Sequence, residues 1–237
     1  MRSPDRRSLV TYGVLVAILI SVKILFLILP SRFPLEDQAS AFSWITILVI
    51  ALLGVAGLYL EPRAGFPAMW DDTVSNAQRF GVPTLDGIAY GLVTVLGDLG
   101  HPDDVHMQFP QSIAFYMFGA IFLEILLRLF GLTLLTWFFG SIVMRGKAWN
   151  TAFWIANIVT SMYEVWPQMM GHLARATRLE SPGVVIQSIL SPLFIGNLVA
   201  GWLYRRYGFL TAIILRIVFY AIWHVAYGGF RPLWLSL

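Results

Sequence analysis

Residues 112–139 read SIAFYMFGAIFLEILLRLFGLTLLTWFF, an uninterrupted apolar run apart from the two charges Glu124 and Arg128. An α-helix needs about 20 predominantly apolar residues to cross the hydrocarbon core of a bilayer. This stretch meets that length and therefore predicts a membrane-spanning helix that carries an acid and a base within it.

The composition of the whole chain extends this prediction to its other helices. Of its 237 residues, 58% are hydrophobic and 12% are charged, whereas a soluble domain carries about 25% charged residues. A disordered chain is excluded, because disorder needs low hydrophobicity and high charge. The chain has no cysteine, which excludes disulfides, zinc–thiolate sites, thiol nucleophiles and iron–sulfur clusters. We expect an all-α, polytopic membrane protein that forms a single membrane domain over residues 1–237.

Further apolar runs predict spans at residues 9–29, 41–60, 148–171, 184–204 and 209–227. Residues 1–60 therefore hold two N-terminal spans, and residues 61–111 form an acidic loop around the apolar segment 85–96. That segment is too short for a comfortable span and predicts a short, re-entrant or interfacial helix. The total is six or seven membrane segments, depending on whether it crosses.

Loop charges predict the orientation of the chain. If residues 85–96 cross, one side of the membrane holds only Arg32, Arg175, Arg178 and Arg231. The other side then holds Arg2, Arg6, Arg7, Arg63, Arg79, Arg145, Lys147, Arg205 and Arg206. The positive-inside rule then favours seven segments with a cytoplasmic N-terminus, in an inner or plasma membrane. If they do not cross, the bias weakens. Basic residues scattered at the ends of apolar runs indicate no nucleic-acid partner, and the lipid bilayer is the expected one.

Ionisable residues inside spans are costly, so they usually face the bundle interior and have partners. Glu124 and Arg128 are four residues apart and can pair on one helix face. They form either a salt bridge that orients the helix or a carboxylate positioned as a catalytic base. Glu164 and Arg216 are a second acid and base in mid-span, and Pro167 predicts a kink beside Glu164. We interpret the four charges as one buried cluster joining three helices.

His224 lies on the last predicted span, two turns beyond Arg216. A lone histidine in a membrane helix is more often a hydrogen-bonded packing residue than a ligand. It is nevertheless the one weak candidate to bind a haem or a chlorophyll, although the sequence requires no cofactor. The other histidines, His101, His106 and His172, fall in loops or at a helix end. No helical two-histidine zinc motif is present.

Two segments in the second half of the chain resemble a known family. The sequence GWLYRRYGFL at residues 201–210, followed by Arg216, and LEILLR at residues 123–128 are similar to motifs of the CPBP family. These are the CAAX prenyl-protease and bacteriocin-processing membrane proteins, also called Abi. The resemblance implies a four-helix core over residues 112–229 and, in the family, intramembrane peptidase activity from glutamate and histidine side chains.

The motif set is incomplete. In the first motif, Leu123 replaces the leading glutamate. The second motif should lie at residues 161–167, which contain no histidine. In the last motif, the positions of the histidine and the asparagine fall at or beside Arg216 and Tyr220. Arginine stays protonated and cannot serve as a base. We therefore expect a non-catalytic membrane subunit or binding scaffold, with another membrane protein or a transmembrane helix as its partner.

Two alternatives to this scaffold function remain. The first is an intramembrane endopeptidase with a rearranged site, in which Glu124 or Glu164 is the base and His224 and Arg216 stabilise the oxyanion. The family's arginine, Arg128, belongs to that site. The second alternative is a pigment, haem or proton-handling subunit.

Overall fold

The structure, a computed structural model, describes residues 4–29, 43–100, 106–175, 177 and 180–230. It is 83% helical, and the elements in these ranges are all helices, which confirms the all-α prediction. The α-helices are α1 (Arg6–Ile28), α2 (Trp44–Ala64), α3 (Val82–Gly100), α4 (Gln111–Glu124), α5 (Thr133–Trp137), α6 (Trp149–Leu173), α7 (Ser181–Ile189), α8 (Pro192–Tyr207) and α9 (Phe209–Tyr220). The π-helical segments are η3 (Ala77–Gly81), η4 (Ile125–Leu132), η5 (Phe138–Val143) and η6 (Ala221–Gly228). Some residues named in the sequence analysis lie outside the described ranges: Arg2, Arg32, His101, Arg178 and Arg231.

Six helical stretches within the described residues are long and apolar enough to cross a membrane: Arg6–Ile28, Trp44–Ala64, Ala77–Leu99, Gln111–Val143, Ser181–Tyr207 and Phe209–Gly228. They make the chain an integral membrane protein. Five of them coincide with predicted spans. The span predicted at residues 184–204 is built from two helices, α7 and α8, because the chain turns at Leu190 and Ser191 before Pro192 begins α8.

The helix predicted at residues 85–96 is longer in the structure than the sequence indicated. The structure extends it into a continuous helix over Ala77–Leu99, long enough to span. The prediction left out both ends of this helix, because Arg79 and Pro83 precede the apolar segment and Asp98 follows it. Pro83 lies in the first turn of α3, directly after the π-helical segment η3. The region 61–111 is therefore mostly helix rather than an acidic loop.

Helix α6 confirms the helix predicted at residues 148–171, but it is less apolar than the other long helices and is not one of the six stretches. It carries Asn150, Asn157 and Glu164 within its 25 residues. At 1.5 Å per residue its length still matches the hydrocarbon core. Its crossing stays a prediction, which is tested below.

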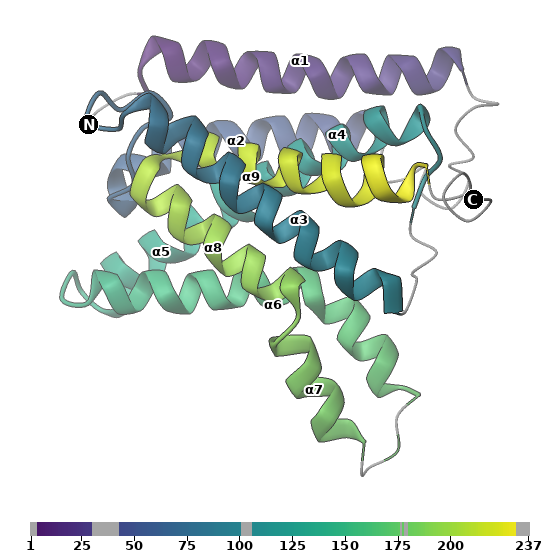
Figure 1. Ribbon diagram of the computed structural model, residues 1–237. Coiled ribbons are helices and arrows are strands. Elements are labelled where there is room, and N and C mark those ends of the chain that lie inside the picture. Colours follow the sequence, from purple (N-terminus) through teal and green to yellow (C-terminus); the bar gives the residue numbers. More distant parts are fainter. Residues whose placement is uncertain (1–3, 30–42, 101–105, 176, 178–179, 231–237) are drawn as a thin grey trace.

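Helix α9 occupies the middle of the bundle and packs against α3, α4 and α8. Figure 1 shows α1 along one side of the bundle and α5 with α6 on the opposite side, with α9 between them. The C-terminal part of α6, which contains Pro167, extends with α7 away from the other helices (Figure 1). Helices α8 and α9 are joined by Gly208 alone, whose φ of 91° favours a residue without a side chain.

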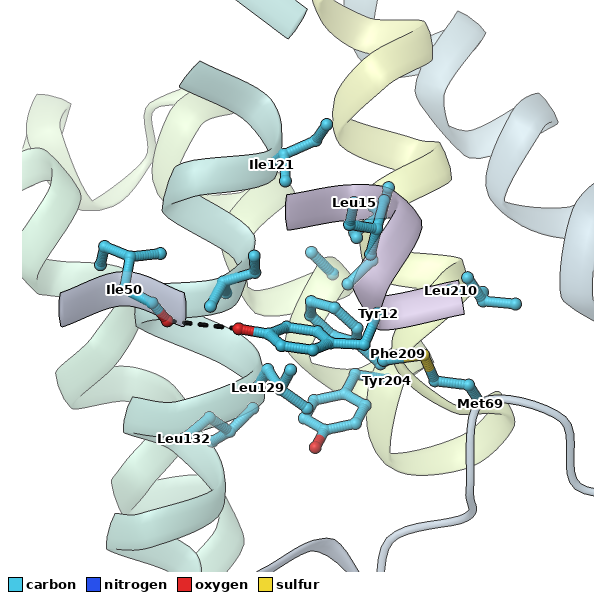
Figure 2. Close-up of a cluster of buried hydrophobic side chains, with 14 of the residues drawn as sticks. Tyr12, Leu15, Ile50, Met69, Ile121, Leu129, Leu132, Tyr204, Phe209 and Leu210 are labelled. Atoms are coloured by element: carbon cyan, nitrogen blue, oxygen red, sulfur yellow. Dashed lines mark hydrogen bonds between the residues drawn. The ribbon is translucent and has the colours of Figure 1, made fainter. Parts of the chain in front are cut away.

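The hydrophobic core lies between the N-terminal helices and the second half of the chain. Tyr12 of α1 donates a hydrogen bond to the backbone oxygen of Ala51 at 2.7 Å and a longer one to that of Ile50 at 3.3 Å. Figure 2 shows this ring lying among Leu129, Leu132, Tyr204 and Phe209, which come from η4, α8 and α9. Helix α2 lies so close to η4 that a methyl group added at Gly57 would overlap the carbonyl of Leu129. These contacts hold the N-terminal helices against the segment that carries Arg128.

Candidate functional site

Arg216 of α9 is the centre of a buried cluster of charged side chains. Its Nε donates to Glu124 Oε1 at 2.7 Å, and both of its terminal nitrogens donate to the carboxylate of Glu164. The Nη2–Oε2 distance of that second pair is 2.9 Å. One guanidinium therefore binds two carboxylates from two other helices, α4 and α6, in the forked geometry that suits this side chain.

Asn197 of α8 connects the two arginines. Its Oδ1 accepts from Arg216 Nη2 at 2.7 Å and from Arg128 Nη2 at 2.8 Å. Arg128 Nη2 also donates to the backbone oxygen of Asn197 at 2.9 Å. The cluster thus joins four helices rather than the predicted three. The prediction from the sequence left out Asn197 because this residue carries no charge. A polar amide within an apolar helix was the one sign that could have indicated its role.

The predicted pair on one helix, Glu124 and Arg128, is present but loose. Arg128 Nε lies 4.0 Å from Glu124 Oε2, beyond hydrogen-bonding distance. The π-helical segment η4 begins directly after Glu124, and its wider turn moves side chains away from the regular i,i+4 register. Each of these two residues therefore makes its shorter contacts with another helix, Glu124 with α9 and Arg128 with α8.

The four charges are shielded from water and balance one another. Glu124 and Arg128 are fully buried, and Arg216 is almost so. The Glu164 side chain keeps 12% of its surface exposed. Two carboxylates and two guanidiniums give the cluster no net charge, which is the condition under which ions persist in an apolar interior.

His224 is not part of this cluster. Its Nδ1 lies 3.1 Å from Nδ1 of His106, and His106 Nε2 lies 2.9 Å from Asp98 Oδ2. The ring of Tyr116 stacks on His224 with centroids 3.9 Å apart. The sequence could not reveal this group, because its members come from the end of α3, the segment before α4, and η6. It is a hydrogen-bonded packing arrangement at the far end of the helix from Gly208.

A third polar group was also missed in the sequence. Glu61 is buried near the end of α2, and the hydroxyl of Tyr204 donates to its Oε1 at 3.0 Å. The hydroxyls of Tyr204 and Thr133 lie 2.7 Å apart and share a hydrogen bond. The charge of Glu61 and the adjacent Pro62 suggested that the span stops there, but α2 continues to Ala64.

Three cavities bounded by described residues lie away from the charged cluster. One of about 330 Å³ lies between α3, α8 and α9 and is largely apolar. One of about 290 Å³ lies between α6 and α8, and the largest, of about 610 Å³, is lined by Asp5, Glu61, Arg205 and Arg206 among others. None of the three is lined by Glu124, Arg128, Glu164 or Arg216. Within the described residues, no group of three or more His, Asp or Glu side chains could hold a metal ion.

The geometry limits what the cluster can do chemically. A general base needs a free lone pair within hydrogen-bonding reach of its substrate or of a water molecule. Both oxygens of Glu164 and Glu124 Oε1 accept hydrogen bonds from Arg216. The remaining oxygen, Glu124 Oε2, has no hydrogen-bond partner among the described residues, but it is buried and lines none of the three cavities. The cluster is therefore arranged to hold helices together.

Comparison of the chain with protein-family models, with curated proteins and with solved structures finds no match. The CPBP resemblance accordingly stays a prediction from the motifs.

The cluster predicts a large stability loss when its central cation is removed. In Arg216→Met, two buried carboxylates lose their shared partner, and we expect the free energy of unfolding to fall by about 3–5 kcal/mol. The double variant Glu164→Gln/Arg216→Met removes one charge of each sign, leaves Glu124 beside Arg128, and should recover most of this loss. Equilibrium unfolding in mixed micelles of increasing SDS content measures both.

The matched control is Arg175→Met, the same chemical change at an exposed residue after α6, which should shift stability by less than about 0.5 kcal/mol. Equal losses in Arg216→Met and Arg175→Met, or a double variant no more stable than Arg216→Met, would contradict a charge-paired core.

Proposed function

We propose that this chain is a non-catalytic integral membrane protein with a CPBP-like core, which acts as a membrane subunit or binding scaffold. The observation that carries the proposal is the double engagement of Arg216, whose guanidinium binds two buried carboxylates, Glu124 and Glu164. A peptidase needs at least one of those carboxylates available to a water molecule.

The position of His224 gives the same proposal a second support. The rearranged peptidase site required His224 and Arg216 to act on one developing oxyanion. His224 instead hydrogen-bonds to His106, and Arg216 donates to carboxylates and to Asn197. Donors already engaged in this way are not aimed at an empty oxyanion position, as the chemistry requires.

A surface for a partner is available where α6 leaves the bundle. Tyr163 and Trp166 of α6 are 64% and 51% exposed, and they flank Glu164 just before Pro167. Tyrosine and tryptophan are the residues that most often carry binding energy in interfaces. The extended arm formed by the end of α6 and by α7 would present both rings to a transmembrane helix of another protein.

We also propose that the chain crosses an inner or plasma membrane seven times, with its N-terminus in the cytoplasm. Crossing by α3 and α6 would bring Arg7, Arg63, Arg145, Lys147, Arg205 and Arg206 to one side of the membrane. That distribution satisfies the positive-inside rule.

The first expected outcome is the absence of peptidase activity. Wild-type protein reconstituted in liposomes should cleave neither helical transmembrane peptides nor prenylated peptides above the level of empty liposomes, because its carboxylates are engaged by Arg216. Cleavage products are measured by mass spectrometry. Cleavage that Glu124→Gln abolishes and that the control Glu180→Gln, at an exposed acid, preserves would identify an endopeptidase instead.

The second expected outcome concerns the partner. Wild-type protein purified in mild detergent should carry a stoichiometric membrane partner, and Tyr163→Ala/Trp166→Ala should lower its recovery by about tenfold or more, since two aromatic anchors are lost. Recovery is quantified by mass spectrometry of the purified complex. Trp44→Ala, at a tryptophan of α2 that is 49% exposed, is the control and should keep the partner. A preparation without any stoichiometric partner would overturn the scaffold proposal.

The third expected outcome concerns topology and uses the absence of native cysteines. Single variants Lys147→Cys and Arg175→Cys place one thiol at each end of α6, and Arg7→Cys places one in the first turn of α1. In intact cells a membrane-impermeant maleimide should label only Arg175→Cys, whereas all three should react after permeabilisation. Labelling of Lys147→Cys and Arg175→Cys from the same side would show that α6 does not cross.

A further inference from the structure

A basic pocket lies between α6 and α8, at the end of the bundle where α6 begins and α8 ends. Its volume is about 290 Å³, and it is lined by Asn150, Trp154, Trp202, Arg205 and Arg206. Two of these residues are arginines, two are tryptophans, and none is acidic. The pocket therefore has a strong positive charge at an opening flanked by aromatic rings.

The first arginine is positioned by its neighbours. Arg205 Nη1 donates to Asn150 Oδ1 at 3.0 Å, and its guanidinium carbon lies 4.3 Å from the ring centre of Phe153. This hydrogen bond joins the end of α8 to the start of α6. The remaining nitrogens of Arg205 are available to an anion, because a guanidinium has five N–H donors.

The second arginine is more exposed. Arg206 Nε donates to the hydroxyl of Tyr207 at 3.1 Å, and its guanidinium carbon lies 5.6 Å from the ring centres of Trp202 and Tyr207. Among the described residues, neither Arg205 nor Arg206 forms an ion pair. Both arginines also line the cavity of about 610 Å³ together with Asp5, Glu61 and Asp71, but they form no ion pair with these acids. Two adjacent arginines that no ion pair neutralises repel each other and favour a bound anion.

The surface leading away from the pocket is apolar. Trp154 and Ile158 share a face of α6 at i and i+4, and Ile195 and Trp202 share a face of α8 at i and i+7. All four are exposed, from 39% to 47%. These faces lie on two stretches of helix that pack together, so they form an apolar surface directly adjoining the two arginines.

We propose that this pocket binds the phosphate group of an anionic phospholipid, with the acyl chains lying along the exposed faces of α6 and α8. The arrangement supplies each part that such a ligand requires. Arginines suit a phosphodiester because their donors are arranged in a planar fork. Tryptophan rings favour the depth of the lipid headgroups, and basic pockets between transmembrane helices recognise anionic headgroups.

The experiment measures which lipids remain with the protein. Protein in nanodiscs of equimolar phosphatidylcholine and phosphatidylglycerol is released and analysed by native mass spectrometry. We expect phosphatidylglycerol to be retained over phosphatidylcholine by about tenfold or more, since each basic residue near an anionic lipid contributes roughly a factor of five. Arg206→Gln should lower the preference about fivefold, and Arg205→Gln/Arg206→Gln should bring it close to parity.

The matched control is Arg145→Gln/Lys147→Gln, which removes the same number of charges from the loop just before α6. It should leave the preference for phosphatidylglycerol unchanged. Arg206→Gln replaces an exposed side chain and keeps the Asn150–Arg205 hydrogen bond, so the test does not depend on the double variant folding.

Three results would overturn the proposal. An equal loss of preference in the control would assign the effect to diffuse surface charge. Displacement of the lipid by millimolar inorganic phosphate would assign the pocket to a free anion. Equal retention of the two lipids by wild-type protein would show that the headgroup is not recognised.

Discussion

The second half of this protein depends on one constraint, that a guanidinium in an apolar interior cannot give up its proton. Arg216 is almost fully buried, so its charge must be compensated by acceptors that the surrounding helices provide. Glu124 from α4, Glu164 from α6 and Asn197 from α8 supply them. Such a cluster adds little net stability compared with an apolar core, but it penalises every arrangement that separates its members. It therefore specifies which faces of four helices meet.

Polar residues occur at three levels along the bundle rather than at the centre alone. Glu61, Tyr204 and Thr133 lie near the end where α8 turns into α9, and Asp98, His106 and His224 lie near the opposite end. Arg216 lies between these levels, midway along the helix that α9 and η6 form together. The hydrogen bonds described for each group join members of the same group, although Glu124 Oε2 and Arg128 Nη1 in the central one are buried without a hydrogen-bond partner in the described part of the chain. The membrane-facing surface is thereby left to apolar side chains and to the basic pocket beside α6.

Much of this arrangement could be read from the sequence, because membrane helices produce strong signals. Low charge content indicated the class, and mid-span charges are so costly that Glu124, Arg128, Glu164 and Arg216 had to be partners. The extra members were inaccessible for physical reasons. Asn197 carries no charge to attract notice. His106 and His224 are far apart in sequence and meet only once the bundle forms. Arg79, Pro83 and Asp98 lie at the two ends of the helix that contains α3, so its length was underestimated.

The order of the charged residues along the chain has a consequence for biosynthesis. Glu124 and Arg128 lie on one helix and enter the membrane together, each reducing the cost of the other. Glu164 follows without a partner on its own helix, but a carboxylic acid can bind a proton and remain uncharged until Arg216 is inserted. Arg216 has no such option, and its helix comes after all of these, joined to α8 by Gly208 alone. The one arginine of the cluster that has no acidic partner on its own helix is thus the last of the four residues to be made, when its acceptors are already in place.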